Sequence, residues 1–106
     1  MYNENWSKGE KAVARRAYEA ARSREYAALT EKVRHRAKSI RDPEDIWALH
    51  DFLTRQRKLF DQKYNYRYSK LLFVFAELIS DGWLTEAELA GLDDERLARV
   101  RFLLEL

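Results

Sequence analysis

The chain has 106 residues, of which 36% are charged, with one Pro, three Gly and no Cys. This length fits one domain, and the composition favours helices over a β-sandwich or barrel. The lack of Cys excludes a disulfide framework and a thiol nucleophile. No apolar run approaches the roughly 18 residues that span a bilayer, and the opening MYNENWSKGE lacks the apolar core of a signal peptide. We therefore expect a soluble, cytoplasmic protein.

Charge is unevenly distributed along the chain although the net charge is only +2. Residues 1–41 hold 11 Lys and Arg against 5 Asp and Glu, whereas residues 42–106 hold 9 against 13. The basic part either lies against the acidic remainder, within or between chains, or meets an acidic partner. We give the first interpretation more weight because most charge runs are solvated faces.

The first long helix is predicted from Ser7 to about Ile40. Ser7 is a typical N-cap, and Glu10 three residues later completes a capping box. The second half of this helix carries an apolar seam at steps of three and four: Tyr26, Leu29, Val33, Ala37 and Ile40. The Ala-rich first half has few large apolar side chains, so we expect it to be more exposed.

The second long helix is predicted from Pro43 to about Lys63, with Asp42 as its N-cap. Its apolar stripe consists of Ile46, Leu49, Leu53 and Phe60. Two long helices with narrow stripes form little core in one chain, so we expect a homodimer. The expected dimer interface consists of Leu29, Val33, Ile40, Ile46, Trp47, Leu49 and Leu53.

Shorter helices are predicted after an irregular connector at residues 64–69. The third helix should run from about Arg67 to Ser80 and end at Gly82, a left-handed cap. A capping box at Thr85 opens a short helix through Leu89, and Asp93 caps a final helix to about Glu105. We expect Leu72, Phe75, Ile79, Leu97, Val100 and Leu104 to face inward, and Phe73, Arg96 and Arg99 to face outward.

The predicted fold is therefore all-α and consists of one domain over residues 1–106. Two long helices form a dimerising stalk, residues 1–63. The remaining helices form a compact C-terminal helical head, residues 64–106. The short connectors and the lack of a low-complexity linker support this organisation.

Trp47 is the most informative residue of the second helix. At about 100° per residue, a polar sector of roughly 120° adjoins the apolar stripe. That sector contains Arg57, His50, Asp61, Thr54, Trp47, Lys58 and Asp51. A large aromatic side chain is out of place on a solvated face, so this surface is expected to meet another molecule. The residues alone leave open whether that molecule is a second copy or a different partner.

Enzymatic and metal sites are poorly supported. The sequence has no Gly-rich phosphate loop and no Ser elbow. His50 and Asp51 lie about 100° apart on the helix, so they are badly placed for Asp51 to hold His50 by a hydrogen bond as a catalytic base. A calcium loop ending at Glu88 is excluded because Ile79 falls where an oxygen ligand is required. We expect no catalytic residue, no cofactor and no metal ion.

Nucleic-acid binding is an alternative with less weight. The first helix is rich in Lys and Arg, and three Tyr follow at residues 64–68. Four Glu interrupt the basic run, the total charge is close to neutral, and helix-in-groove signatures are missing. We therefore do not expect a nucleic acid as the partner.

Several segments are similar to the fluorescence recovery protein family of cyanobacteria. They are WSKGE at 6–10, IWALHDFL at 46–53 with Arg57, DQKY at 61–64, Arg67, FVFAEL at 73–78 and the EL..L pattern at 88–92. The resemblance implies a non-enzymatic, all-α homodimer that binds the C-terminal domain of the photoactivated orange carotenoid protein. It further implies faster reversion of that protein to its resting orange form and its release from the phycobilisome.

The resemblance also assigns partner-binding residues. On the stalk these are Trp47, His50, Asp51 and Arg57, and on the head they are Phe73 and Arg99. Arg99 departs from the Lys that members often carry, which keeps the charge but changes the geometry. The implied location is the cytoplasm, including the cytoplasmic side of the thylakoid membrane. Relatives of this family also occur in bacteria that lack phycobilisomes. The alternative partner is therefore a different carotenoid protein or another protein.

Overall fold

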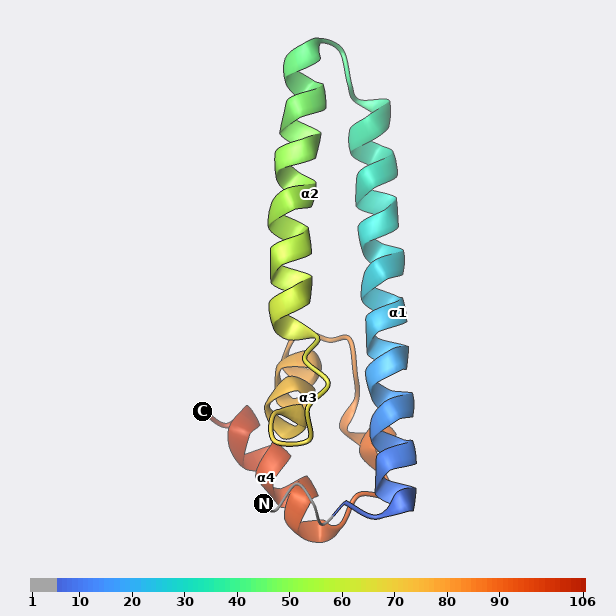
Figure 1. The fold of residues 1–106 in the computed structure, drawn as a ribbon, viewed down its shortest axis with the longest axis vertical. Helices are drawn as coiled ribbons and strands as arrows, with labels where there is room; N and C mark the ends of the chain where they lie inside the picture. Colours follow the sequence, from blue (N-terminus) through green and yellow to red (C-terminus); the bar gives the residue numbers. More distant parts are fainter. Residues whose placement is uncertain (1–5) are drawn as a thin grey trace.

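The computed structural model describes residues 6–106, so the first five residues of the expected domain and of the opening MYNENWSKGE lie outside the described residues. The helices are α1 (Lys8–Lys38), α2 (Pro43–Lys63), α3 (Leu71–Ser80), the 3-10 helix η2 (Glu86–Leu89) and α4 (Asp94–Leu104). Helices α1 and α2 form a long antiparallel hairpin, and α3, η2 and α4 gather beside the N-terminal half of α1 (Figure 1). The shape is elongated, 54 × 27 × 24 Å. The all-α prediction is confirmed.

The helix starts follow the predicted capping signals. The Ser7 hydroxyl accepts the Glu10 backbone N–H at 3.1 Å, and the Glu10 carboxylate accepts the Ser7 N–H at 3.1 Å. Pro43 occupies the first turn of α2. The Asp93 carboxylate accepts the Arg96 N–H at 2.8 Å and so caps α4. These bonds satisfy N–H groups that have no partner inside their own helix.

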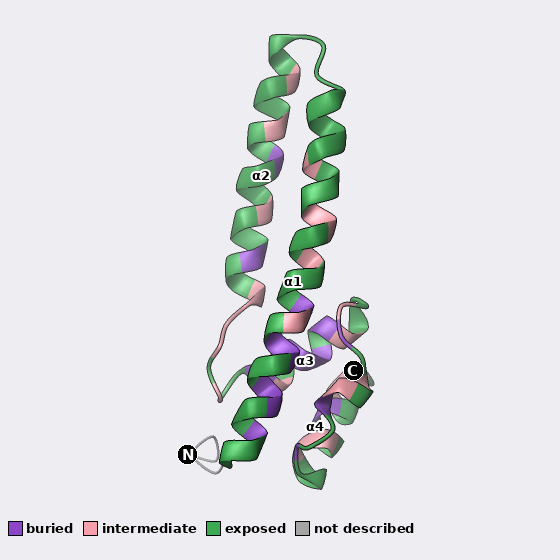
Figure 2. Cartoon of the chain, turned by 90° about the vertical axis from the view of Figure 1, so that its right-hand side faces the viewer, coloured by how far each residue is buried: buried purple, intermediate pink, exposed green. Residues whose placement is uncertain are grey.

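The buried core lies where the N-terminal half of α1 meets the head, which corrects the expectation that this half is more exposed (Figure 2). Its fully buried members include Ala14 and Ala21 of α1 and Phe75 of α3. Small Ala side chains let the α1 backbone approach the head closely, so few large apolar residues are needed on α1. Gly91 shows the same closeness: a Cβ there would lie 2.7 Å from Val13 Cγ2. The division expected at residue 63 stays a prediction, and the core joins residues from both sides of it.

Helix α3 begins at Leu71 rather than Arg67. The N–H groups of Lys70 and Leu71 both donate to the Arg67 carbonyl, at 2.8 and 2.9 Å, so a turn precedes the helix. Its buried side is also rotated from the predicted one. Leu71, Val74, Phe75, Ala76 and Leu78 are buried, whereas Leu72 and Ile79 are only half-buried. The reason is that α1 and α4 both pack on α3 and cover a wider face than one neighbour would.

The outer part of the hairpin is thinly packed. Phe52 and Phe60 are the buried residues of α2, and Phe60 stacks on Tyr26 of α1 with ring centroids 4.5 Å apart. The predicted α2 stripe is split: Phe60 is buried and Leu49 half-buried, whereas Ile46 and Leu53 are exposed in the single chain. Apolar side chains therefore remain uncovered along one edge of the hairpin.

Candidate partner-binding site

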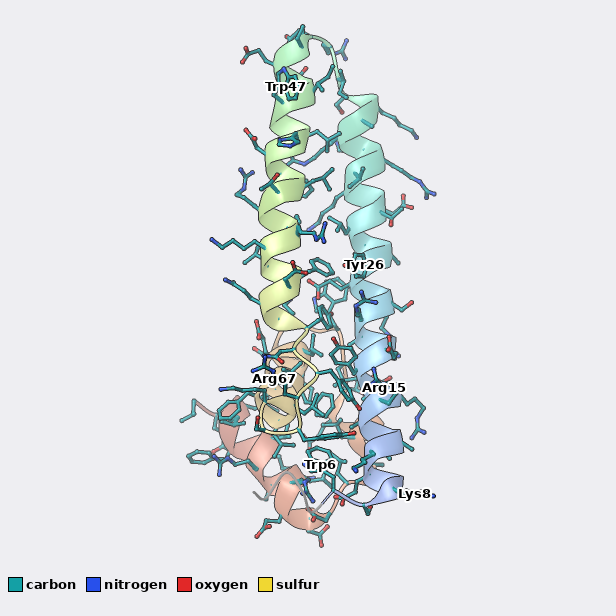
Figure 3. The ribbon with its side chains drawn as sticks, viewed as in Figure 1. Trp6, Lys8, Arg15, Tyr26, Trp47 and Arg67 are labelled. Atoms are coloured by element: carbon teal, nitrogen blue, oxygen red, sulfur yellow. The ribbon has the colours of Figure 1, made fainter. Side chains whose placement is uncertain are left out.

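The stalk carries an exposed aromatic residue where the sequence predicts one. Trp47 lies near the tip of the hairpin (Figure 3) and is 64% exposed. Its ring meets the His50 imidazole edge to face, with centroids 6.1 Å apart. Helix α2 presents His50 and Trp47 together because they are three residues apart.

His50 and Asp51 are closer than the helix geometry predicts. His50 Nδ1 lies 3.4 Å from Asp51 Oδ1, which corrects the expectation that the two side chains are badly placed for contact. Rotation of both flexible side chains closes the gap left by the backbone. Both are about two-thirds exposed, 67% and 69%, so water screens the pair and it is not a buried base of the catalytic kind.

Arg57 extends this surface along α2. Its side chain is 83% exposed, and its Nε lies 3.7 Å from Asp61 Oδ2. An exposed pair at that distance contributes little, so the guanidinium is available to a partner carboxylate. We call Trp47, His50, Asp51 and Arg57 the Trp47 surface. The exposed Ile46 and Leu53 adjoin it, so apolar and charged contacts are offered side by side.

Phe73 and Arg99 come together in the head. They line one groove of about 590 Å³ between α3 and α4. Phe73 is 51% exposed, and Phe102 on the same groove is 57% exposed. Sequence reasoning missed Phe102, although its position three residues after Arg99 places both on one face of α4.

Arg96 is not the outward-facing residue that the sequence predicts. Its side chain is only 11% exposed, and its Nη1 lies 3.1 Å from Glu10 Oε2 and 2.9 Å from Asp93 Oδ2. The guanidinium also covers the Trp6 ring at 4.4 Å. Burial alone would raise the pKa of Glu10, but hydrogen bonds from the Asp93 and Ser7 N–H groups and the Arg96 charge outweigh it, so the pKa is lowered. The packing of α4 on the start of α1 creates this site, which no local pattern reveals.

The structure does not bring all six predicted residues together. Trp47 lies near the tip of the hairpin, whereas Phe73 on α3 and Arg99 on α4 belong to the head at the other end of the long axis (Figures 1 and 3). The two regions are therefore separate contact areas on one chain. A single small ligand cannot span them, whereas a protein surface can.

Basic residues of α1 pair with acidic ones, and one of these pairs, Arg24 with Glu88, joins the basic part to the acidic remainder as the first interpretation of the charge asymmetry predicts. Arg24 Nη1 and Nη2 donate to the two oxygens of the Glu88 carboxylate, at 2.9 and 2.7 Å, and so join α1 to η2. The hydrogen bond from Arg24 lowers the pKa of Glu88 to about 2; burial opposes this shift, and hydrogen bonds from Thr85 add to it. Arg15 and Arg34 pair with Glu19 and Glu31 within the helix. Such pairing reduces the free positive charge available to a nucleic acid.

Residues 6–106 contain neither a metal-binding cluster nor a membrane-spanning helix. No group of three or more His, Asp or Glu side chains in this range is arranged to hold a metal ion. None of the described helices is both long enough and apolar enough to cross a membrane.

The fold and these surfaces define an all-α protein built as a helical hairpin with a small helical head. Residues 6–104 match the family described as "photoprotection regulator fluorescence recovery protein". The fluorescence recovery protein of Synechocystis sp. is 35% identical over 101 residues, which cover 95% of this chain and 93% of that protein. The chain therefore belongs to the fluorescence recovery protein family, whose members are regulators of photoprotection.

Solved structures support the same assignment. The fluorescence recovery protein of Fremyella diplosiphon has a TM-score of 0.90 and 46% identity, and the Synechocystis one has a TM-score of 0.90 and 35% identity. Each comparison covers 95% of this chain and 99% of the other. The resemblance predicted from the sequence is confirmed.

Proposed function

We propose that this protein is a non-enzymatic regulator that binds the C-terminal domain of the photoactivated orange carotenoid protein. Binding accelerates reversion of that protein to the resting orange form and promotes its release from the phycobilisome. Membership of a family of photoprotection regulators supports the biological role. The observation that carries the binding role is Trp47, which is 64% exposed beside the imidazole of His50 and the charged side chains of Asp51 and Arg57. Exposed Trp and Arg are the residues that most often anchor protein contacts.

The proposed mechanism needs no covalent step. A regulator accelerates a conformational change when it binds the rearranging state more tightly than the starting state. In this proposal Trp47 supplies apolar contact and Arg57 pairs with a carboxylate of the opened carotenoid protein. Phe73 and Arg99 form the second contact from the head groove. Two separated contacts on one chain would hold the partner in an arrangement that favours closure.

We further propose that the protein acts as a homodimer. Ile40, Ile46 and Leu53 are exposed in the single chain, at 36%, 49% and 38%. A second copy would cover these side chains together with the half-buried Leu29, Val33 and Leu49, and part of Trp47. The proposed location is the cytoplasm, including the cytoplasmic side of the thylakoid membrane, because the proposed partner acts on phycobilisomes.

A recovery assay tests the proposal. Orange carotenoid protein is converted to its photoactivated form by light, and its return to the orange form is followed in the dark with sub-stoichiometric or equal amounts of this protein. We expect faster recovery, and we expect Arg57→Leu to impair it without loss of helicity. Arg55→Leu is the matched control, since Arg55 is also exposed on α2 but outside the Trp47 surface. No acceleration with carotenoid proteins from several species would refute the proposal.

A further inference from the structure

A largely buried ionic cluster joins the stalk to the head. Lys63, the last residue of α2, places its Nζ 3.0 Å from Glu25 Oε2 of α1 and 3.2 Å from Asp81 Oδ2 at the end of α3. The Lys63 and Glu25 side chains are each 14% exposed, and Asp81 is 42% exposed. One ammonium group therefore connects three helices at the point where the chain leaves the hairpin (Figure 1).

Neighbouring hydrogen bonds surround this cluster, and Lys63 stays charged within it. The Tyr64 hydroxyl donates to Glu25 Oε1 at 2.6 Å, and the Tyr18 hydroxyl donates to the Tyr64 carbonyl at 3.0 Å. Burial alone would lower the pKa of Lys63, but the bonds and charges of Glu25 and Asp81 outweigh it and raise that pKa. Burial and the bond to Glu25 also raise the pKa of Tyr64, which stays a donor. At neutral pH the Lys63 ammonium is therefore charged and the Tyr64 hydroxyl is protonated, so both donate to the Glu25 side chain.

Aromatic packing shares the junction with this cluster: the Tyr18 ring meets the Tyr64 and Tyr66 rings edge to face, with centroids 5.5 and 4.8 Å apart. Helix α2 ends at Lys63, and residues 64–70 contain no regular helix, so α2 and α3 are not one continuous rod. The contact between α1 and α2 buries only Phe52 and Phe60 on the α2 side. Removal of the ammonium would leave Glu25 in a largely buried place without the cation that compensates it, an arrangement that strongly destabilises local packing.

We infer that Lys63 is a positioning residue that fixes the direction of α2 relative to the head. It thereby sets the separation between the Trp47 surface and the head groove that holds Phe73 and Arg99. The cluster lies outside both contact areas, so it acts on their arrangement and not on their chemistry. The effect on a carotenoid protein rests on the proposed function, whereas the effect on the geometry of the chain does not.

Spin-label distances test this inference directly. The chain contains no Cys, so labels attach only at Ala48→Cys on α2 and Asp94→Cys on α4, both exposed positions. The labelled protein is diluted with unlabelled protein so that the measured distance lies within one chain. We expect Lys63→Met to give a broader distance distribution than the parent, with new distances populated. A distribution unchanged by Lys63→Met overturns the inference.

Matched variants separate positioning from a general loss of stability. Lys8→Met makes the same chemical change at an exposed lysine and is expected to leave the distances unchanged. Asp81→Asn removes the charge that links Lys63 to α3 and keeps the Lys63–Glu25 pair, so it decides the question if Lys63→Met loses helicity. With Asp81→Asn we expect broadened distances, a retained helical circular dichroism signal, and amide exchange in residues 64–70 roughly threefold faster, since water partly screens the 42% exposed Asp81.

The recovery assay then distinguishes the two proposals. If the wild-type protein does not accelerate orange recovery but Lys63→Met and Asp81→Asn broaden the distances, the proposed function is wrong and the positioning role of Lys63 stands. If the wild-type protein accelerates recovery and neither variant changes the distances, the proposed function stands and the positioning role is wrong.

Discussion

Replacing Trp47 by Ala measures how much binding free energy the stalk surface supplies. Because the side chain is already 64% exposed, its truncation should change the free energy of unfolding of the single chain by less than about 1 kcal/mol. The exposed 64% of a side chain of about 200 Å² is about 130 Å². If partners bury all of it, the loss at about 25 cal/mol per Å² is about 3 kcal/mol, roughly a hundredfold in affinity.

Two equilibria have to be measured because Trp47 is proposed to contact both a second copy and a carotenoid protein. Sedimentation velocity gives the monomer–dimer dissociation constant, and titration with the isolated C-terminal domain of the orange carotenoid protein gives the partner constant. We expect the losses of binding free energy in the two equilibria to reach about 3 kcal/mol together. The ratio of these losses gives the share of the Trp47 side chain that each contact buries.

Leu59→Ala is the control for the Trp47 measurement. Leu59 is 54% exposed on the same helix but lies about 120° around it from Trp47. Both dissociation constants should be unchanged in this variant. If Trp47→Ala changes neither constant by more than about threefold, Trp47 is not an anchor and the area argument is wrong.

Two further predictions test the dimer seam and the charge pairing. Ile46→Glu places a charge in the proposed dimer interface and should yield monomers or unfold the chain. If light scattering still reports an intact dimer, Ile46 does not lie in the interface. Glu88→Gln should destabilise the protein near pH 7 because Arg24 lowers the pKa of Glu88 from 4.5 to about 2. Because the pKa of Glu88 is lower in the folded protein than in the unfolded chain, ionised Glu88 stabilises the fold at a pH above 4.5. The difference in free energy of unfolding between the wild type and Glu88→Gln should therefore disappear as the pH falls from 4.5 towards 2. Urea unfolding across this range checks it, and a difference that persists at pH 2 would mean that the stabilisation does not come from the charge.

The two halves of helix α1 pack against different parts of the protein. In its first half, Ala14, Ala17 and Ala21 are fully or almost fully buried against the head. In its second half, Leu29 and Val33 are half-buried, and α2 is the neighbouring helix there. One continuous helix therefore contacts both the head and α2, and the Lys63 cluster links α2 to the head near the boundary between the two halves of α1.

Local signals made the helices and part of the candidate site predictable. Ser7, Asp93 and the capping box at Thr85 mark helix starts because a side chain there binds N–H groups within three residues. Exposure of Trp47 and Phe73 followed from helical periodicity alone, because a position on a helix wheel depends only on the spacing along the chain.

The amino-acid sequence by itself determined which segments are helical, where all of them except α3 begin, and that Trp47, His50 and Arg57 share one side of α2. Only the tertiary structure decided which faces are covered. Arg96 was predicted to face outward, yet it is buried against Glu10, 86 residues away in the chain. The groove that joins Phe73 to Phe102 and the link from Lys63 to Glu25 and Asp81 likewise depend on helices that meet only after folding. The physical reason is that helix formation and capping are short-range, whereas burial depends on which neighbour packs on a face, and that choice is made by the whole chain.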